Sequence, residues 1–421
     1  MAVATRTTGE VCASAKRASR LLATAKTATK NLVLEREAEL LSERGEEILE
    51  ANGADVDAGR AAGLDPALLD RLTLTPDRIA AIAEGVRAVR DLPDPVGEVI
   101  EERTLRSGIE MRKLRVPLGV VAVVYEARPN VTVDCAALTL KSGNAIVLRG
   151  SSNAARSNAV LAQAMQDAVA EAGLPEGSVE LLGGGERSEM AELATAEGLV
   201  DLIIPRGGEG LKEALKEVAT VPVLYAAAGN CHVYVDADAD LEMARAIAFN
   251  AKVERPGVCN AAETLLVHAD VAEDFLLGLF GELRAAGVEL VGDERARSFA
   301  GDAEVGEASE EDWRTEFHRL KLAVGVVDSL EQAIDWVNEY STGHSDAIVT
   351  ASEQAAETFT GLVDTACVYV NASTRFTDGF EFGMGAEIGN STQKLHARGP
   401  IGLRELTSMK FVLHGSGQIR S

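Results

Sequence analysis

Residues 119–148, with the sequence GVVAVVYEARPNVTVDCAALTLKSGNAIVL, decide the fold of this chain. Two apolar runs of strand length, GVVAVVY at 119–125 and NAIVL at 144–148, flank a segment with helical spacing. Neither run alternates polar with apolar residues, so each strand is expected to be buried on both faces, as in a parallel sheet. The stretch predicts a strand-helix-strand unit and therefore an α/β fold.

The same alternation continues toward the C-terminus. Further elements of the first sheet are predicted as a helix over 153–171, a helix near Leu211, and strands at 179–182, 199–204 and 221–225. A second α/β region is predicted after Asn230, with a helix at 241–251 and strands at 231–235, 261–268, 320–327, 347–350 and 367–371. Ligands of such sheets bind at the carboxyl ends of the strands.

The N-terminal side is different. Helical spacing runs from 9 to 52 and resumes after Pro66 and Pro76, until the sequence DLPDP at 91–95 ends it. Residues 102–115 then alternate charged and apolar side chains around a Ser-Gly turn, which predicts a hairpin. The hairpin is either an arm that pairs with another subunit or an edge hairpin within one chain.

Composition sets the class of protein. A chain of 421 residues, 46% hydrophobic and 4% aromatic, is expected to form two or three domains with cores of small aliphatic residues. A net charge of −25 argues against nucleic-acid binding through a basic surface. The sequence shows neither a signal peptide nor a membrane span, so we expect a cytoplasmic protein without a membrane partner. Its five cysteines are scattered, and we expect no disulfide framework and no metal site: Cys12, Cys135, Cys231, Cys259 and Cys367.

Cys259 stands out among these cysteines. In VERPGVCNAAETLLVH at 253–268, a Pro-Gly turn delivers its thiol to the start of an apolar segment. Arg255 and unpaired backbone N–H groups are expected to lower the thiol pKa and favour the nucleophilic thiolate. The alternative is a buried cysteine that acts as a small hydrophobic residue.

Two glycine-containing loops follow predicted strands. LRGSSN at 148–153 and PRGGEG at 205–210 can hold phosphate through backbone N–H groups, or can be ordinary turns with capping residues. Neither G-x-G-x-x-G nor G-x-x-x-x-G-K-S/T occurs in the chain. A regular Rossmann dehydrogenase or a P-loop kinase is therefore poorly supported.

Several ordered motifs together carry a resemblance. They are VPLGVVAVVYEARPN at 116–130, LKSGNA at 140–145, RPGVCN at 255–260, STGHS at 341–345 and NASTRFTDG at 371–379. Across nearly its whole length the chain resembles the γ-glutamyl phosphate reductase family of the aldehyde dehydrogenase superfamily.

The resemblance implies an α/β fold with three parts. A Rossmann-like parallel-sheet domain for NADP, with N-terminal helices, is expected from 1–101 and 118–228. An α/β catalytic domain with Cys259 is expected at 229–400. A small β oligomerisation arm is expected from 102–117 and 401–421, in which the tail strand pairs with the hairpin of the same or a neighbouring subunit.

The resemblance also implies an activity in proline biosynthesis. The reaction is NADPH-dependent reduction of glutamyl 5-phosphate to glutamate 5-semialdehyde, with phosphate released and an acyl group carried on Cys259. The Asn130 amide and the Cys259 backbone N–H would form the oxyanion hole, although an Asn after Pro is often only a turn residue. Aldehyde-oxidising relatives carry a glutamate that activates water, whereas 221–235 holds no Asp or Glu, which favours a reductase.

Further contacts follow from matching positions and chemistry. Cofactor contacts are expected from Arg149, Gly150, Ser151, Ser152, Arg206, Gly207 and Gly208, and from Glu316 unless it is only a solvated acid. The basic group of Arg149 and the hydroxyl groups of Ser151 and Ser152, which follow the strand at 144–148, favour NADP(H). Substrate contacts are expected from Arg128, Arg255 and Arg375, unless these form surface salt bridges, and from His344, unless it is structural.

The expected partners are a second copy of the chain, as a homodimer or homotetramer, and a glutamate kinase that supplies the acyl phosphate. Two other functions stay open on the residues alone. One is a phosphate-independent NAD(P)-dependent aldehyde dehydrogenase, and the other is a non-catalytic nucleotide-binding protein.

Overall fold

The computed structural model of the protein describes residues 6–225, 228–301 and 303–420. Five helices come first: α1 (Thr8–Leu22), α2 (Thr27–Glu43), α3 (Gly45–Ala61), α4 (Pro66–Leu72) and α5 (Pro76–Asp91). The helical pattern over 9–52 is thus divided among three helices. Thr7 begins α1 with a capping box, and apolar residues of α1, α2 and α5 are buried together against the first sheet, so the chain must turn between them.

The first sheet is parallel, with the order β5-β4-β3-β6. Its elements are β3 (Val120–Tyr125), α6 (Pro129–Lys141), β4 (Ala145–Arg149), α7 (Ala155–Glu171), β5 (Val179–Leu181), α8 (Arg187–Ala194), β6 (Leu202–Arg206) and α9 (Glu209–Val218). Every residue of β3 is buried, which confirms the expected burial on both faces. The strand predicted at 221–225 is wrong, because that segment makes only an isolated bridge between Val223 and Ile203. Pro222 has no N–H to donate to a longer ladder.

The second sheet is also parallel and follows the order β10-β9-β11-β8-β7-β12-β13. Its strands are β7 (Cys231–Val235), β8 (Ala262–His268), β9 (Glu289–Gly292), β10 (Val305–Glu307), β11 (Lys321–Val327), β12 (Ser345–Val349) and β13 (Cys367–Val370). Its helices are α10 (Leu241–Val253), α11 (Ala269–Ala285), α12 (Glu294–Ser298), α13 (Glu310–Arg314), α14 (Leu330–Tyr340) and α15 (Glu353–Leu362). All five strands predicted for this region are confirmed. β9 and β10 were not predicted: they have the sequences ELVG and VGE, and each combines a glycine and a glutamate with few apolar residues.

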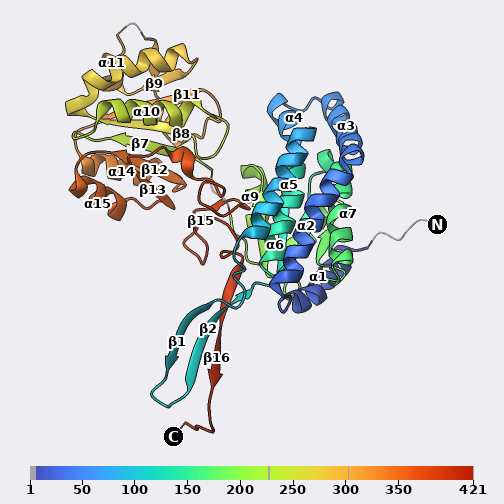
Figure 1. Ribbon diagram of the computed structural model, residues 1–421. Coiled ribbons are helices and arrows are strands. Elements are labelled where there is room, and N and C mark those ends of the chain that lie inside the picture. The colour runs from blue at the N-terminus through green and yellow to red at the C-terminus, as the bar shows by residue number, and fades with distance from the viewer. Residues whose placement is uncertain (1–5, 226–227, 302, 421) are drawn as a thin grey trace.

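The predicted hairpin is confirmed as β1 (Val99–Thr104) and β2 (Glu110–Pro117). The tail strand β16 (Thr407–His414) pairs with β2 of the same chain along its whole length, antiparallel. Figure 1 shows this three-stranded arm pointing away from the rest of the molecule. A small two-stranded pair, β14 (Asn390–Ser391) and β15 (Gly399–Pro400), precedes the arm.

Figure 1 shows the second sheet with α10 and α11 on one side of the molecule and helices α1–α7 on the other. The domain limits expected from the sequence stay a prediction. Ile388 and Ala397, which fall in the segment assigned to the catalytic domain, are buried in the core that surrounds the first sheet. The chain therefore returns to the first sheet before it enters the arm. Within the described residues, no helix combines the length and the apolar character needed to cross a membrane.

Candidate active site

Cys259 lies in the turn between α10 and β8, and the residue is exposed, whereas the other four cysteines are buried. Gly229 and Cys231 pack closely against the backbone of this turn. A Cβ added to Gly229 would lie 1.6 Å from the Cys259 carbonyl oxygen, and the Cys231 Sγ donates to the same oxygen at 3.2 Å. These contacts fix the backbone that presents the thiol.

Asn260 ties the turn to the segment after β13. Its Nδ2 donates to the carbonyl oxygens of Arg375 and Thr377, at 3.2 and 2.9 Å, and its carbonyl oxygen accepts from Thr374 Oγ1 at 2.7 Å. The Arg375 guanidinium binds Asn260 Oδ1 and donates from Nε to Glu254 Oε2 at 3.1 Å. Arg375 is therefore already engaged with the Cys259 turn, and its predicted substrate contact stays a prediction.

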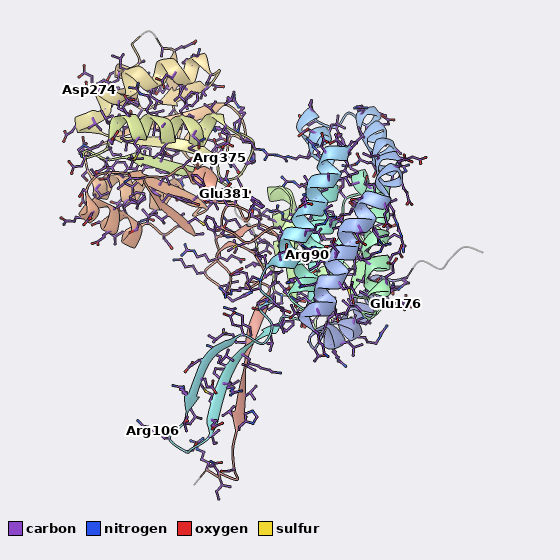
Figure 2. All side chains as sticks on the ribbon, in the orientation of Figure 1. Arg90, Arg106, Glu176, Asp274, Arg375 and Glu381 are labelled. Atoms are coloured by element: carbon purple, nitrogen blue, oxygen red, sulfur yellow. The ribbon has the colours of Figure 1, made fainter. Side chains whose placement is uncertain are left out.

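Arg375 also lines a cavity of about 340 Å³. The other lining residues are Asn250, Glu254, Phe376, Asp378 and Glu381. Figure 2 labels Arg375 and Glu381 on the side of the second sheet that faces the helices. With three carboxylates against one guanidinium, this cavity is poorly suited to a doubly anionic ligand.

The electrostatic surroundings of the thiol differ from those expected. Loss of hydration raises the pKa of Cys259 to about 11, while the Arg206 and Arg128 charges act to lower it. The expected net lowering by Arg255 is wrong, because desolvation outweighs the cations and the strongest of these come from elsewhere in the chain. Arg255 itself is exposed.

Arg206 and Arg128 come from neighbouring strand ends of the first sheet. Arg206 is the last residue of β6, and its carbonyl oxygen accepts from the Glu126 N–H at 3.1 Å. Arg128 follows β3 and precedes α6; burial and the Arg206 charge lower its pKa to about 10. Two guanidinium groups thus act on the thiol from the carboxyl edge of the sheet, where ligands of parallel sheets bind.

Asn130 lies in the first turn of α6. Its Nδ2 donates to Asp134 Oδ2 at 2.9 Å, and both side chains are half-buried. Burial raises the pKa of Asp134 to about 6, although the Asn130 hydrogen bond and the Arg206 charge oppose this shift. The predicted oxyanion donor is thus held by a carboxyl group that the sequence did not single out.

The loops after β3, β4 and β5 meet at the same edge. Ser151 Oγ accepts from the Ala127 N–H at 3.2 Å. Gly184 has φ +73°, and a Cβ there would lie 2.3 Å from the Gly150 carbonyl oxygen, so this contact requires glycine. Ser152 is exposed at the start of the short helix before α7.

Arg149 ends β4 and points its guanidinium toward α8. Its Nη2 donates to the Glu186 carbonyl oxygen at 3.0 Å, and Glu189 Oε2 lies 3.8 Å from its Nε. Within the described chain this buried Nε has no hydrogen-bond partner.

The loop at 205–210 already holds an anion from this chain. The Gly208 N–H donates to Glu126 Oε2 at 3.1 Å, and a Cβ on Gly207 would lie 2.8 Å from the Glu126 carboxyl carbon. Phosphate binding by Arg206, Gly207 and Gly208 stays a prediction, and it would have to displace the Glu126 carboxylate.

Glu316 is not a solvated acid. Its side chain is only 12% exposed, its Oε2 lies 3.1 Å from His318 Nε2, and its Oε1 is buried with no partner found in the described residues. Burial opposes ionisation, but the neighbouring His318 brings the pKa of Glu316 below its ordinary value. Glu316 also lines a cavity of about 310 Å³. The Gly229 backbone N–H also favours the charged form of this carboxylate.

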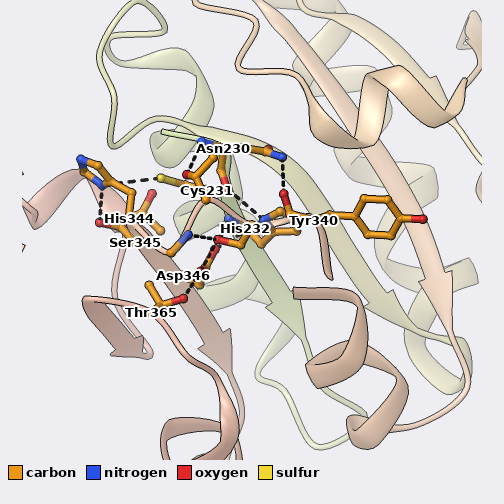
Figure 3. Close-up of polar contacts among 12 residues, drawn as sticks. Asn230, Cys231, His232, Tyr340, His344, Ser345, Asp346 and Thr365 are labelled. Carbon is orange, nitrogen blue, oxygen red and sulfur yellow. Dashed lines mark hydrogen bonds and ion pairs between the residues drawn. The ribbon is translucent and has the colours of Figure 1, made fainter. Parts of the chain in front are cut away.

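His344 belongs to a buried polar network behind the turn (Figure 3). Its Nδ1 lies 2.9 Å from Ser345 Oγ, 3.4 Å from Asn390 Nδ2 and 3.9 Å from Cys231 Sγ. Burial lowers its pKa to about 4, so the ring is neutral at physiological pH. This arrangement fits a structural histidine, and its substrate contact stays a prediction.

Sequence reasoning missed Glu387, which follows the glycine-rich segment before β14. Burial raises its pKa, its Oε2 is buried without a partner among the described residues, and its charge raises the pKa of Cys259. A Cβ on Gly379 would lie 2.8 Å from the Glu387 Cβ, so the glycine allows the segment to fold back. The glycine-rich sequence around Glu387 was the feature that could have pointed to this residue.

Comparisons with known proteins identify the family of the chain. A sequence profile of the aldehyde dehydrogenase family matches residues 2–300 and 321–412. The γ-glutamyl phosphate reductase of Thermobifida fusca is 55% identical over 383 residues, 91% of each chain. That of Heliobacterium modesticaldum is 54% identical over 407 residues, 96% of this chain and 97% of the relative.

Solved structures give the same result. The γ-glutamyl phosphate reductase of Thermotoga maritima has a TM-score of 0.96 at 46% identity, over 99% of this chain and all of the other. An acetylating aldehyde dehydrogenase from Geobacillus thermoglucosidasius shares the fold, with a TM-score of 0.69 at 19% identity over 98% of this chain and 97% of the other. The chain belongs to the aldehyde dehydrogenase family and, within it, to the γ-glutamyl phosphate reductases.

Proposed function

We propose that this chain reduces γ-glutamyl phosphate to glutamate 5-semialdehyde with NADPH and releases phosphate, as a step of proline biosynthesis. One observation carries the proposal. In a chain 55% identical to a γ-glutamyl phosphate reductase, the exposed Cys259 thiol lies within the electrostatic influence of Arg206 and Arg128. Two guanidinium groups that act on a nucleophile suit an acyl phosphate, whose phosphate group carries two negative charges next to the reacting carbon.

In the first step, Cys259 Sγ attacks the acyl carbon and the bond to the phosphate oxygen breaks. The thiol is mostly protonated at neutral pH, since its pKa is about 11, so attack requires transfer of its proton. Glu387, with a raised pKa and an unpartnered Oε2, is the carboxyl group suited to accept that proton and return it later. Arg206 and Arg128 stabilise the departing phosphate.

The tetrahedral stages place negative charge on the former carbonyl oxygen. The Asn130 amide and the Cys259 backbone N–H are the proposed donors to this oxygen. A bound nicotinamide cofactor supplies the hydride that reduces the acyl group. Collapse of the resulting tetrahedral group releases the aldehyde and returns Cys259 to its starting state.

The residues present fit such a cofactor. Arg149 Nε and Glu316 Oε1 are buried polar atoms without hydrogen-bond partners among the described residues, one from each sheet region. Arg149, with the exposed Ser152 beside it, would hold the adenosine end, and Glu316 would accept from a ribose hydroxyl near the nicotinamide. We propose NADP(H) over NAD(H), because a guanidinium binds a 2′-phosphate well and no acidic residue occurs in residues 149–152.

The alternatives make different demands on the same site. A phosphate-independent aldehyde dehydrogenase needs a base to activate water, and residues 221–235 supply no carboxylate. A non-catalytic nucleotide-binding protein would not need an exposed thiol beside two arginines. The first alternative therefore lacks its water-activating base, and the second leaves the Cys259 thiol unexplained.

Oxidation of glutamate 5-semialdehyde in the presence of phosphate, followed as NADP+ reduction, tests the proposal. Cys259→Ala should abolish turnover while the thermal unfolding temperature stays near that of the unchanged protein. Arg149→Ala should reduce the preference for NADP+ over NAD+ by about tenfold, with a smaller change in kcat for NAD+. Normal turnover by Cys259→Ala would reject the mechanism.

We also propose that the arm associates with a second copy of the chain, giving a homodimer or homotetramer. Three large apolar side chains of β16 are about half exposed: Met409, Phe411 and Leu413. Exposed apolar residues on an unpaired strand edge favour such pairing. Sedimentation of Phe411→Lys should show a smaller assembly than the unchanged protein.

Direct capture of the acyl phosphate from a glutamate kinase is a further proposal, tested by transient kinetics of the coupled pair.

A further inference from the structure

Asn130 and Asp134 lie one helical turn apart on α6 and are joined by a hydrogen bond from Nδ2 to Oδ2 of 2.9 Å. Such a pair stabilises a helix by only about 0.2–0.5 kcal/mol. From Val131 onward every residue of α6 except Asp134 is buried, and most of these buried residues are apolar, so a carboxyl group is out of place on this helix. Its raised pKa shows that the surroundings oppose its charge.

The geometry of an amide explains what the carboxyl group can do. The two ends of an asparagine side chain are nearly equal in size, but one end donates two hydrogen bonds and the other only accepts. An oxyanion hole works only with the donating end, because the amide oxygen would repel a developing negative charge. An ionised carboxylate only accepts, so it binds the NH₂ end and excludes the flipped orientation.

We propose that Asp134 is a positioning residue, which holds the Asn130 amide so that its second N–H, and not its oxygen, is presented to the reacting carbonyl. This inference rests on the proposed acyl transfer to Cys259. Nδ2 carries two hydrogens, and the bond to Asp134 uses one of them. The other is directed away from Asp134 by the planar geometry of the amide.

The charges nearby support this arrangement. Asp134 has a pKa of about 6 and is therefore ionised, and an acceptor, at neutral and alkaline pH. A second negative charge close to an oxyanion would be unfavourable on its own. The positive charge of Arg206 offsets the negative charge of Asp134, because Arg206 acts on both Asp134 and Cys259.

A double-mutant cycle tests the proposal on the full-length protein. The variants are Asn130→Ala, Asp134→Leu and the double variant, with Asp134→Asn as the conservative change. Two readouts are used: kcat and KM for phosphate-dependent oxidation of glutamate 5-semialdehyde, and acylation of Cys259 by p-nitrophenyl acetate without cofactor. The second readout also forms an oxyanion, and it does not depend on the natural substrate.

Asn130→Ala should lower kcat by about 10²-fold, and Asp134→Leu by about tenfold with KM little changed. The double variant should be no slower than Asn130→Ala, because Asp134 acts only through that amide. Asp134→Asn should recover most of the loss, since its amide oxygen still accepts. Asp134→Leu should unfold at the same or a higher temperature, because it removes a partly buried charge that its surroundings oppose; a merely structural role predicts the reverse.

The proposal is overturned if Asp134→Leu keeps unchanged kinetics, or if its effect multiplies with that of Asn130→Ala. It is also overturned if Asp134→Asn is as slow as Asp134→Leu. If the unchanged protein lacks phosphate-dependent activity, the proposed function fails, while the p-nitrophenyl acetate cycle still decides the role of Asp134.

Discussion

The backbone of Gly229 packs directly against that of Cys259, so closely that a Cβ at residue 229 would lie 1.6 Å from the Cys259 carbonyl oxygen. No side chain fits there without movement of one of the two segments. The absence of a side chain at residue 229 is therefore part of what positions the thiol.

Gly229→Ala should displace the Cys259 turn and lower kcat by about 10²-fold or more, since small errors in the position of a nucleophile are costly. The loss should appear in acylation of Cys259 as well as in complete turnover. Gly257→Ala is a matched control in the same turn, because its Cβ would come no closer than 3.7 Å to another atom. An active Gly229→Ala protein with an unshifted turn would contradict this packing argument.

The reactivity of Cys259 toward iodoacetamide should rise with pH up to its pKa of about 11 in the protein without ligands. Arg206→Gln should raise that pKa further and slow alkylation at pH 8, because Arg206 is the strongest of the charges that lower it. Arg255→Gln should leave the alkylation profile unchanged. An effect of Arg255→Gln on alkylation as large as that of Arg206→Gln would support the sequence-based expectation that Arg255 lowers the pKa of Cys259.

Glu387→Gln should lower kcat by about 10²-fold, because an amide cannot accept the thiol proton. The same change should lower the pKa of Cys259, since a negative charge that disfavours the thiolate is removed. Faster alkylation together with slower turnover is the expected signature. A parallel fall in both rates would instead indicate a damaged site.

Glu37 lies on α2, fully buried, and neither carboxylate oxygen has a hydrogen-bond partner among the described residues. Burial raises its pKa well above the ordinary value, so the folded protein retains a proton that the unfolded chain loses. Its contribution to stability is complete below the unfolded pKa of about 4.5 and is lost as the pH rises toward the folded pKa.

Glu37→Met should therefore stabilise the protein at pH 8 by about 1–3 kcal/mol, and by less at pH 5, as measured by urea denaturation. Glu39→Met on the exposed face of the same helix is the control and should change stability by less than about 0.5 kcal/mol. A stability gain that did not depend on pH would exclude a titrating Glu37.

The sheets were predictable because each strand carries its own pattern. β3 and β4 are uninterrupted apolar runs, and such runs form central strands wherever they occur. The segment 221–225 has the same composition, but one proline limits it to a single bridge. β9 and β10 were missed because a glycine and a glutamate interrupt each of these short strands.

The site was predictable only where one short stretch of chain builds it. Cys259 and its Pro-Gly turn are contiguous, and that stretch predicted either an exposed thiol or a buried cysteine; the residue is exposed. Its pKa does not follow from that stretch, because desolvation and the charges of Arg206 and Glu387 come from distant segments. Glu126 and Asp134 were missed for the same reason, since their roles depend on which groups the fold brings beside them.

Dependence on phosphate tests the central claim most directly. NADP+ reduction by glutamate 5-semialdehyde should require inorganic phosphate, increase with its concentration to saturation, and be absent in Cys259→Ala. Phosphate is expected to release the acyl group from Cys259, because residues 221–235, where aldehyde-oxidising relatives carry the glutamate that activates water, hold no carboxylate. Full turnover without phosphate would contradict the account and identify an aldehyde dehydrogenase that hydrolyses its acyl group with water.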